Sequence, residues 1–88
     1  MSLQLTIRER LAVLAPLELE IQDESALHAG HAGAASGGHY RISIVAQAFA
    51  GKSRLARHRM VYDALAPLLQ HGIHALAISA FSPDEARN

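Results

Sequence analysis

The residues of this chain best suited to binding a metal are its six histidines, at positions 28, 31, 39, 58, 71 and 74. There is no cysteine, so disulfide bonds, thiolate ligands and a cysteine nucleophile are excluded. His28, His31 and His74 could together hold zinc, but two histidines separated by two residues in a glycine-rich stretch occur often without any metal. Judged from its neighbours alone, His74 is more simply a strand-end histidine that hydrogen-bonds a nearby group.

Basic side chains form a second candidate site. Lys52, Arg54, Arg57 and Arg59 lie near the start of a helix that we predict over residues 53–69. They could bind DNA phosphates or the carboxylates of a protein partner, whereas the commonest role of such a cluster is a solvated helix edge. The net charge of the chain is +0 at pH 7, so any binding of nucleic acid would depend on this local patch.

The apolar pattern of the same helix predicts a different role for His58. On a helical wheel His58 falls within the apolar arc, which predicts a core-facing side chain with a hydrogen-bond partner. Arg57 and Arg59 flank this arc on opposite edges, and Arg59 can pair with Asp63 one turn later. The arc consists of Leu55, Val61, Tyr62, Leu65, Leu68 and Leu69.

Residue spacing also predicts the elements that must position these side chains. Thr6 and Glu9 form a capping box for a first helix, and Pro67 should end the second helix early or kink it. Alternation of apolar and polar residues predicts the strands. We expect residues 1–5 and 83–88 to be flexible. The predicted elements are a helix over 6–16, a strand over 17–22, a long loop over 23–38, a strand over 39–49, a helix over 53–69 and a strand over 73–81.

Eighty-eight residues allow one domain with one small core, which we assign to residues 1–88. The first two strands should form an antiparallel hairpin, and the strand–helix–strand crossover should make the last two parallel. The predicted class is therefore α+β, an αββαβ sandwich in which helices cover one face of a three-stranded mixed sheet.

No apolar run is long enough to span a membrane, so no membrane association is expected. Arg8, Glu9 and Arg10 stand where a secretion signal would be apolar. We therefore expect a cytoplasmic protein.

Four motifs resemble the BolA-like family in their order and approximate spacing. The resemblance covers roughly residues 7–82 and implies the fold of that family, which is related to the type II KH domain. The motifs are DES at 23–25 followed by a histidine loop, HYRISIV at 39–45, FAGKSRLARHRMVY at 49–62 and GIHALAI at 72–78.

The resemblance implies a regulator or adaptor that is not an enzyme, with two described roles. In the first, which we favour, the protein partners a monothiol glutaredoxin with its glutathione and shares a [2Fe-2S] cluster in iron–sulfur trafficking or iron regulation. In the second it is a DNA-binding transcriptional regulator that uses the basic start of the second helix. We expect no cofactor in the isolated chain.

The resemblance also implies the ligands of the cluster. His74 matches the C-terminal histidine of the family, and His28 occupies the loop position at which the family carries histidine or cysteine. His31 could replace His28, because spacing cannot choose between them. The partner would supply the cysteine ligands that this chain lacks, and two imidazoles on one iron is the arrangement of a Rieske centre.

Two other functions are disfavoured. KH domains clamp RNA with a Gly-x-x-Gly loop between helices, whereas the stretch from Gly30 to Gly33 lies between predicted strands. Asp23 and Glu24 near His28 could be drawn as an acid–base pair, but no nucleophile is positioned beside them and so small a domain offers no deep pocket.

Overall fold

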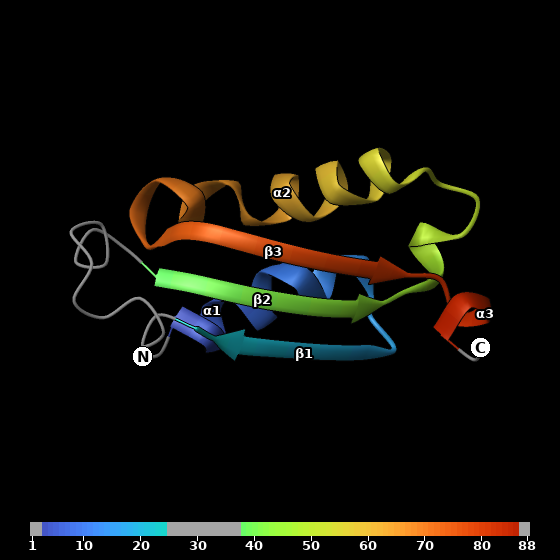
Figure 1. The fold of residues 1–88 in the computed structure, drawn as a ribbon, viewed down its shortest axis with the longest axis horizontal. Coiled ribbons are helices and arrows are strands. Elements are labelled where there is room, and N and C mark those ends of the chain that lie inside the picture. Colours follow the sequence, from blue (N-terminus) through green and yellow to red (C-terminus); the bar gives the residue numbers. More distant parts are fainter. Residues whose placement is uncertain (1–2, 25–37, 87–88) are drawn as a thin grey trace.

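A computed structural model describes residues 3–24 and 38–86 and confirms the predicted αββαβ order (Figure 1). A short helix that was not predicted follows the last strand. In chain order the elements are α1 (Leu3–Leu11), the 3-10 turn η1 (Ala12–Leu14), β1 (Glu18–Asp23), β2 (Gly38–Val45), the 3-10 turn η4 (Gln47–Phe49), α2 (Arg54–His71), β3 (Ile73–Phe81) and α3 (Pro83–Ala86).

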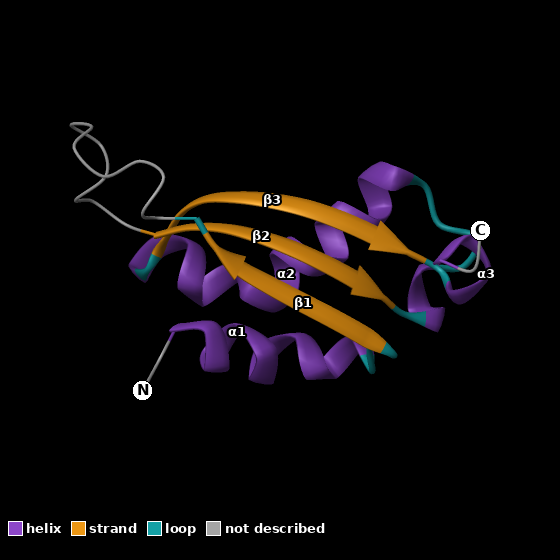
Figure 2. Ribbon diagram, turned by 60° about the horizontal axis from the view of Figure 1, so that its bottom comes forward, coloured by secondary structure: helices purple, strands orange, loops and turns teal. Residues whose placement is uncertain are grey.

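The sheet has the order β1-β2-β3, with β1 antiparallel to β2 and β2 parallel to β3, as predicted. Ile21, Ile42 and Ile78 are paired across the three strands and share one face. Figures 1 and 2 together show α1 and α2 on that face, with α1 towards β1 and α2 towards β3. The fold is therefore a two-layer sandwich, and none of the described helices covers the second face of the sheet.

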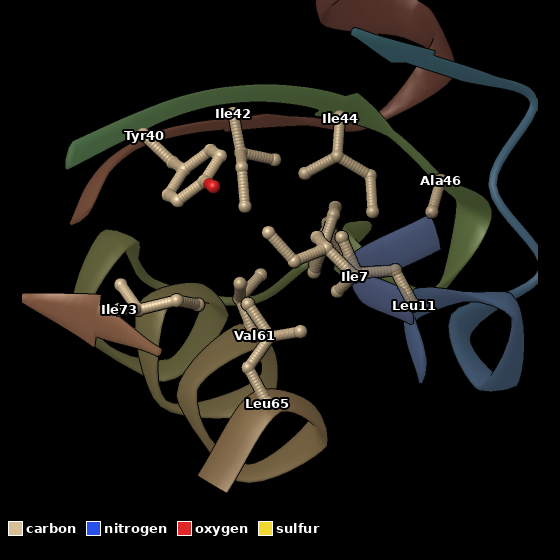
Figure 3. Packing of buried hydrophobic residues seen from close by; sticks show 10 residues of the cluster. Ile7, Leu11, Tyr40, Ile42, Ile44, Ala46, Val61, Leu65 and Ile73 are labelled. Atoms are coloured by element: carbon tan, nitrogen blue, oxygen red, sulfur yellow. The ribbon is translucent and has the colours of Figure 1, made fainter. Parts of the chain in front are cut away.

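The core lies between this sheet and the two long helices (Figure 3). Because side chains alternate across a strand, Tyr40, Ile42 and Ile44 all enter the core from β2, as predicted. The helices contribute residues that are fully buried at helical spacing. The fully buried large side chains are Phe49, Ile7, Leu11, Ile42, Ile44, Leu65 and Val61.

The first helix differs from its prediction at both ends. It begins at Leu3, so Thr6 lies inside it and does not cap it, and residues 3–5 are helical where we expected flexibility. It ends at Leu11, and after η1 the backbone of Ala15 takes a left-handed conformation with φ of 50°. Ala15 precedes Pro16, and a steric clash with the proline ring disfavours the right-handed helical region for the residue before it.

The second strand ends at Val45, not at residue 49 as predicted. Phe49 belongs to η4, and its side chain is fully buried. Gly51 then turns the chain with φ of 75°, a conformation that disfavours residues with a Cβ. Ser53 caps α2 as predicted, its Oγ accepting from the Ala56 amide at 3.1 Å.

The second helix continues through Pro67 to His71, so the prediction of an early end was wrong. A proline inside a helix removes the hydrogen bond to the carbonyl four residues earlier, here that of Asp63. Asp63 and Pro67 are both exposed, so water can solvate that carbonyl. The helix closes at Gly72, whose amide donates to the carbonyl of Leu68.

Two leucines of α2 provide a matched test of this packing. Leu65 is fully buried, whereas Leu55 is 61% exposed although both fall on the predicted apolar arc. Leu65→Ala should lower the free energy of unfolding by about 2–5 kcal/mol, because it removes core contacts and leaves a cavity. Leu55→Ala should cost less than about 1 kcal/mol. Urea unfolding of both variants measures the difference, and equal losses would contradict the assigned orientation of α2.

Candidate functional site

A groove of about 520 Å³ lies between the first turns of α2 and the carboxyl end of β3. It combines cationic side chains from α2 and from the turn before it with mostly apolar side chains from the strand. Its lining residues are Lys52, Arg54, Arg57, His58, Ile78, Ser79, Ala80, Phe81 and Glu85. We call this feature the basic groove.

Arg57 has an internal structural role at the floor of the basic groove. Its guanidinium donates to the Lys52 carbonyl at 3.0 Å and to the Ala80 carbonyl at 3.1 Å. It also forms two hydrogen bonds to the Glu85 carboxylate, at 2.5 and 3.1 Å, and its side chain is only 11% exposed. These contacts occupy both terminal nitrogens and Nε, so Arg57 is the one residue of the predicted basic cluster with little left to offer a ligand.

Glu85 is positioned by the short helix α3. The Ser82 amide donates to the Glu85 carboxylate at 2.8 Å, and the Glu85 amide lies 3.5 Å from the Ser82 hydroxyl. This is a reciprocal capping box, and Pro83 occupies the favoured first position of the helix. We expected residues 83–88 to be flexible, but residues 83–86 are helical. The pattern Ser-Pro-Asp-Glu was the available sequence signal for this helix.

The hydrogen bonds from Arg57 lower the pKa of Glu85 to about 2, with a further contribution from the Ser82 amide. The pKa of Arg57 is raised, chiefly by the same hydrogen bonds to Glu85. Both shifts favour the charged forms, so the pair stays ionised at neutral pH.

The other basic residues remain exposed. Lys52, Arg54 and Arg59 all have solvent-accessible side chains, and Lys52 and Arg54 line the basic groove. Among the residues that the structure describes, Arg59 forms no ion pair with Asp63. Binding of DNA or a protein partner by these exposed residues stays a prediction.

His58 does not face the core as the helical wheel predicted. Its side chain is half-buried and lines the basic groove, outside the core cluster. The reason is that the first turns of α2 border the groove, and the helix meets the core only from about Val61 onward. A helical wheel gives the direction in which a side chain points, but it does not show how far along the helix the contact with the core extends.

The backbone of His74 lies at the opposite end of β3 from the basic groove. Pairing changes from Gly38 with Ile73 to His39 with Ala75, so His74 is the extra residue of a β-bulge. The Gly38 amide donates to the Gly72 carbonyl at 3.0 Å and holds the start of β3 beside the start of β2. Gly38 is required there, because a Cβ would lie 2.3 Å from Cε2 of Tyr40.

His28 and His31 lie outside the described residues. The segment that contains them leaves from Glu24 and returns at Gly38, and the Glu24 amide donates to the His39 carbonyl at 2.7 Å. Both attachment points are therefore at the end of the sheet where β3 begins. Within residues 3–24 and 38–86, no group of three or more metal-binding side chains could hold a metal ion.

The comparison with known proteins identifies the family. The model for BolA-like protein matches residues 11–85, so this chain belongs to the BolA-like family. It is 48% identical over 86 residues to SufE-like protein 1 of Arabidopsis thaliana, which covers 90% of this chain and 23% of that protein. The DNA-binding transcriptional regulator BolA of Escherichia coli is 39% identical over 84 residues, covering 90% of this chain and 78% of that protein.

A solved structure agrees with the fold. The BolA domain of SufE1 from Arabidopsis thaliana superposes with a TM-score of 0.83 at 44% identity, covering 97% of this chain and 98% of that domain. The relative SufE-like protein 1 carries the words chloroplastic and mitochondrial in its name, so the cytoplasmic location stays a prediction. No helix in the described part of the chain is long and apolar enough to cross a bilayer.

The Arg57–Glu85 pair predicts an acid dependence of stability. Because folding lowers the pKa of Glu85 from 4.5 to about 2, its ionised form stabilises the folded state at every pH above 4.5. That contribution is lost as the pH falls from 4.5 to about 2. Glu85→Gln should therefore be less stable than the parent protein at pH 7, and the difference should shrink through this window.

Urea unfolding between pH 2 and 7 measures the effect. Glu9→Gln is a matched control, since Glu9 is exposed and has no ion pair with any described residue. A difference between Glu85→Gln and the parent that stayed constant down to pH 2 would contradict the role assigned to this pair.

Proposed function

We propose that this protein is a non-enzymatic BolA-like adaptor that binds a monothiol glutaredoxin and shares a [2Fe-2S] cluster with it, in iron–sulfur trafficking or iron regulation. One observation carries the proposal: the bulge at His74 lies at the end of the sheet from which the His28 and His31 segment leaves and to which it returns. Topology thus brings the backbone of His74 and the two attachment points of that segment to one end of a chain that has no cysteine.

The available donors fit a shared cluster and not a private one. Iron–sulfur clusters are normally held by four cysteine thiolates, and this chain can offer only imidazole nitrogens or carboxylate oxygens. His74 with His28 or His31 would supply imidazoles, and the partner would supply the thiolates. Bound in this way, the cluster would carry one-electron redox chemistry, at a potential raised by imidazole ligands above that of all-cysteine clusters.

The basic groove is a separate surface. A strand rises about 3.3 Å per residue, so the backbone of His74 lies roughly 20 Å from that of Ala80. Glutathione bound to an iron at His74 would not reach Lys52 or Arg54 over this distance. Any role of the groove in recognising glutaredoxin would require a second contact with the protein itself.

A titration of cluster-loaded glutaredoxin with this protein, monitored by visible circular dichroism, tests the proposal. The parent protein should change the spectrum, because the ligands of one iron change. His74→Ala should abolish the change, and the His28→Ala/His31→Ala double variant should weaken or abolish it. His58→Ala is the control variant, because His58 lines the basic groove near the opposite end of β3 from His74. This variant should change the spectrum as the parent protein does. A parent spectrum without change, or changes that survive both ligand variants, would overturn the assignment.

DNA binding is a second candidate function. It is supported by the exposed cations at the start of α2 and by the name of the Escherichia coli relative, a DNA-binding transcriptional regulator. With Arg57 engaged internally, the free contacts are Lys52, Arg54 and Arg59. Three phosphate contacts give a logarithmic salt slope of about −2.7, which is typical of modest affinity.

Mobility-shift titrations at several salt concentrations measure that slope. Arg54→Ala should weaken binding and make the slope shallower by about 0.9, because one phosphate contact is lost. Arg10→Ala removes an exposed arginine from α1 and should leave the slope unchanged. Binding that is indifferent to Arg54→Ala would exclude this use of the helix.

A further inference from the structure

The two edges of the sheet differ in how they are protected. The edge strand β1 carries Glu18, Glu20 and Asp23, and charges on an edge discourage pairing with another strand. The other edge strand, β3, has no charged residue and no proline along its nine residues. An uncharged edge of this length is a ready template for another strand.

The pairing pattern identifies which backbone groups of β3 point away from the sheet. The Phe81 carbonyl accepts from the Ala46 amide at 3.0 Å, so Phe81 is directed towards β2. Since this direction alternates along a strand, the amides and carbonyls of Leu76, Ile78 and Ala80 point outward. Arg57 donates to the Ala80 carbonyl from that side, which agrees with the assignment.

In the part of the chain that the structure describes, Leu76 and Ile78 pair with no strand on their outer side. Figures 1 and 2 together show most of α2 over one face of β3, and the first turns of α2 on the outer side of the carboxyl end of that strand. The basic groove opens beside Ile78 and Ala80, and Lys52 and Arg54 are exposed at its rim. Within the described residues, β3 ends the sheet, so no further strand pairs with its outward groups.

We propose that the free edge of β3 binds an extended acidic segment of another protein as a fourth strand. The backbone of the segment pairs with Leu76 and Ile78, and a carboxylate at one end of it meets Lys52 and Arg54. Arg57 closes the site at Ala80 by occupying the last outward carbonyl. Strand addition of this kind gains affinity from main-chain hydrogen bonds and specificity from side-chain pockets.

Charge explains why the occupant is a different protein and not a second copy. Pairing β3 with β3 would bring no carboxylate to Lys52 and Arg54, because β3 has none. Pairing β3 with the acidic β1 of a second copy would be a head-to-tail contact that leaves an outer edge free on each copy, so it would build a ring or a filament and not a closed dimer. This inference uses neither glutaredoxin nor a cluster, so its outcome is independent of the proposed function.

Two fluorescent peptides as long as β3, nine residues, provide the test. Both alternate threonine and valine, and the two differ only in whether a pair of glutamates stands at the amino or the carboxyl end. One of them should bind, and which one binds assigns the direction of the added strand. On binding, the amide signals of Leu76 and Ile78 should shift in nuclear magnetic resonance spectra, and their amide hydrogens should exchange more slowly with solvent. Methylating alternate backbone nitrogens of that peptide should weaken binding at least about tenfold, because pairing is blocked.

The charge contribution has its own matched variants. The Lys52→Glu/Arg54→Glu double variant should bind the acidic peptide with an affinity at least about tenfold lower. The control variant Arg10→Glu on α1 should bind it with unchanged affinity. Failure of both peptides to bind, or equal binding of the methylated peptide, would overturn the proposal. Dimerisation without peptide, with the Ile78 amide protected, would also overturn it, because a second copy would then be the occupant.

Discussion

Arg57 joins three parts of the chain that are distant in sequence. Its charged head contacts the turn before α2 at Lys52, the free edge of β3 at Ala80 and the helix α3 at Glu85. An arginine side chain that is only 11% exposed is tolerated because a carboxylate and two carbonyls replace most of the water that its guanidinium has lost. This one side chain lines the basic groove and also bonds to the short helix that follows Ser82. The same contacts explain why Arg57, although it lies within a run of basic residues, has a structural role and little hydrogen-bonding capacity left for a ligand.

The molecule separates two possible activities along β3. At its start, a bulge and the hydrogen bond from the Gly38 amide to the Gly72 carbonyl hold the backbone of His74 at the end of the sheet where Glu24 and Gly38 lie. At its end, exposed cations border a groove and an uncharged strand edge. Because the two ends of β3 are roughly 20 Å apart, a protein could occupy one end without blocking the other. Such an arrangement would suit the proposed adaptor.

The residue pattern along the chain predicted those features that depend on residues close together in sequence. The alternation of Tyr40, Ile42 and Ile44 predicted both the strand and its buried face, and Ser53 predicted the start of α2. The crossover rule then predicted the mixed sheet. Contacts between distant residues could not be predicted in this way. The pairing of Arg57 with Glu85 spans 28 residues. The orientation of His58 into the groove depends on where along α2 the helix stops contacting the core, and this is set by the packing of the helix layer on the sheet. The helix α3 is an intermediate case, because its capping box was present in the sequence but was outweighed by its position near the chain end.

The central claim is that histidines of this chain bind iron in a cluster shared with glutaredoxin. Its most direct test is pulsed electron paramagnetic resonance on the reduced complex, with nitrogen-15 histidine incorporated only into this chain. The claim predicts hyperfine coupling of nitrogen-15 to the cluster, and the loss of this coupling in His74→Ala. A reduced cluster in the complex without any nitrogen-15 coupling would contradict the claim.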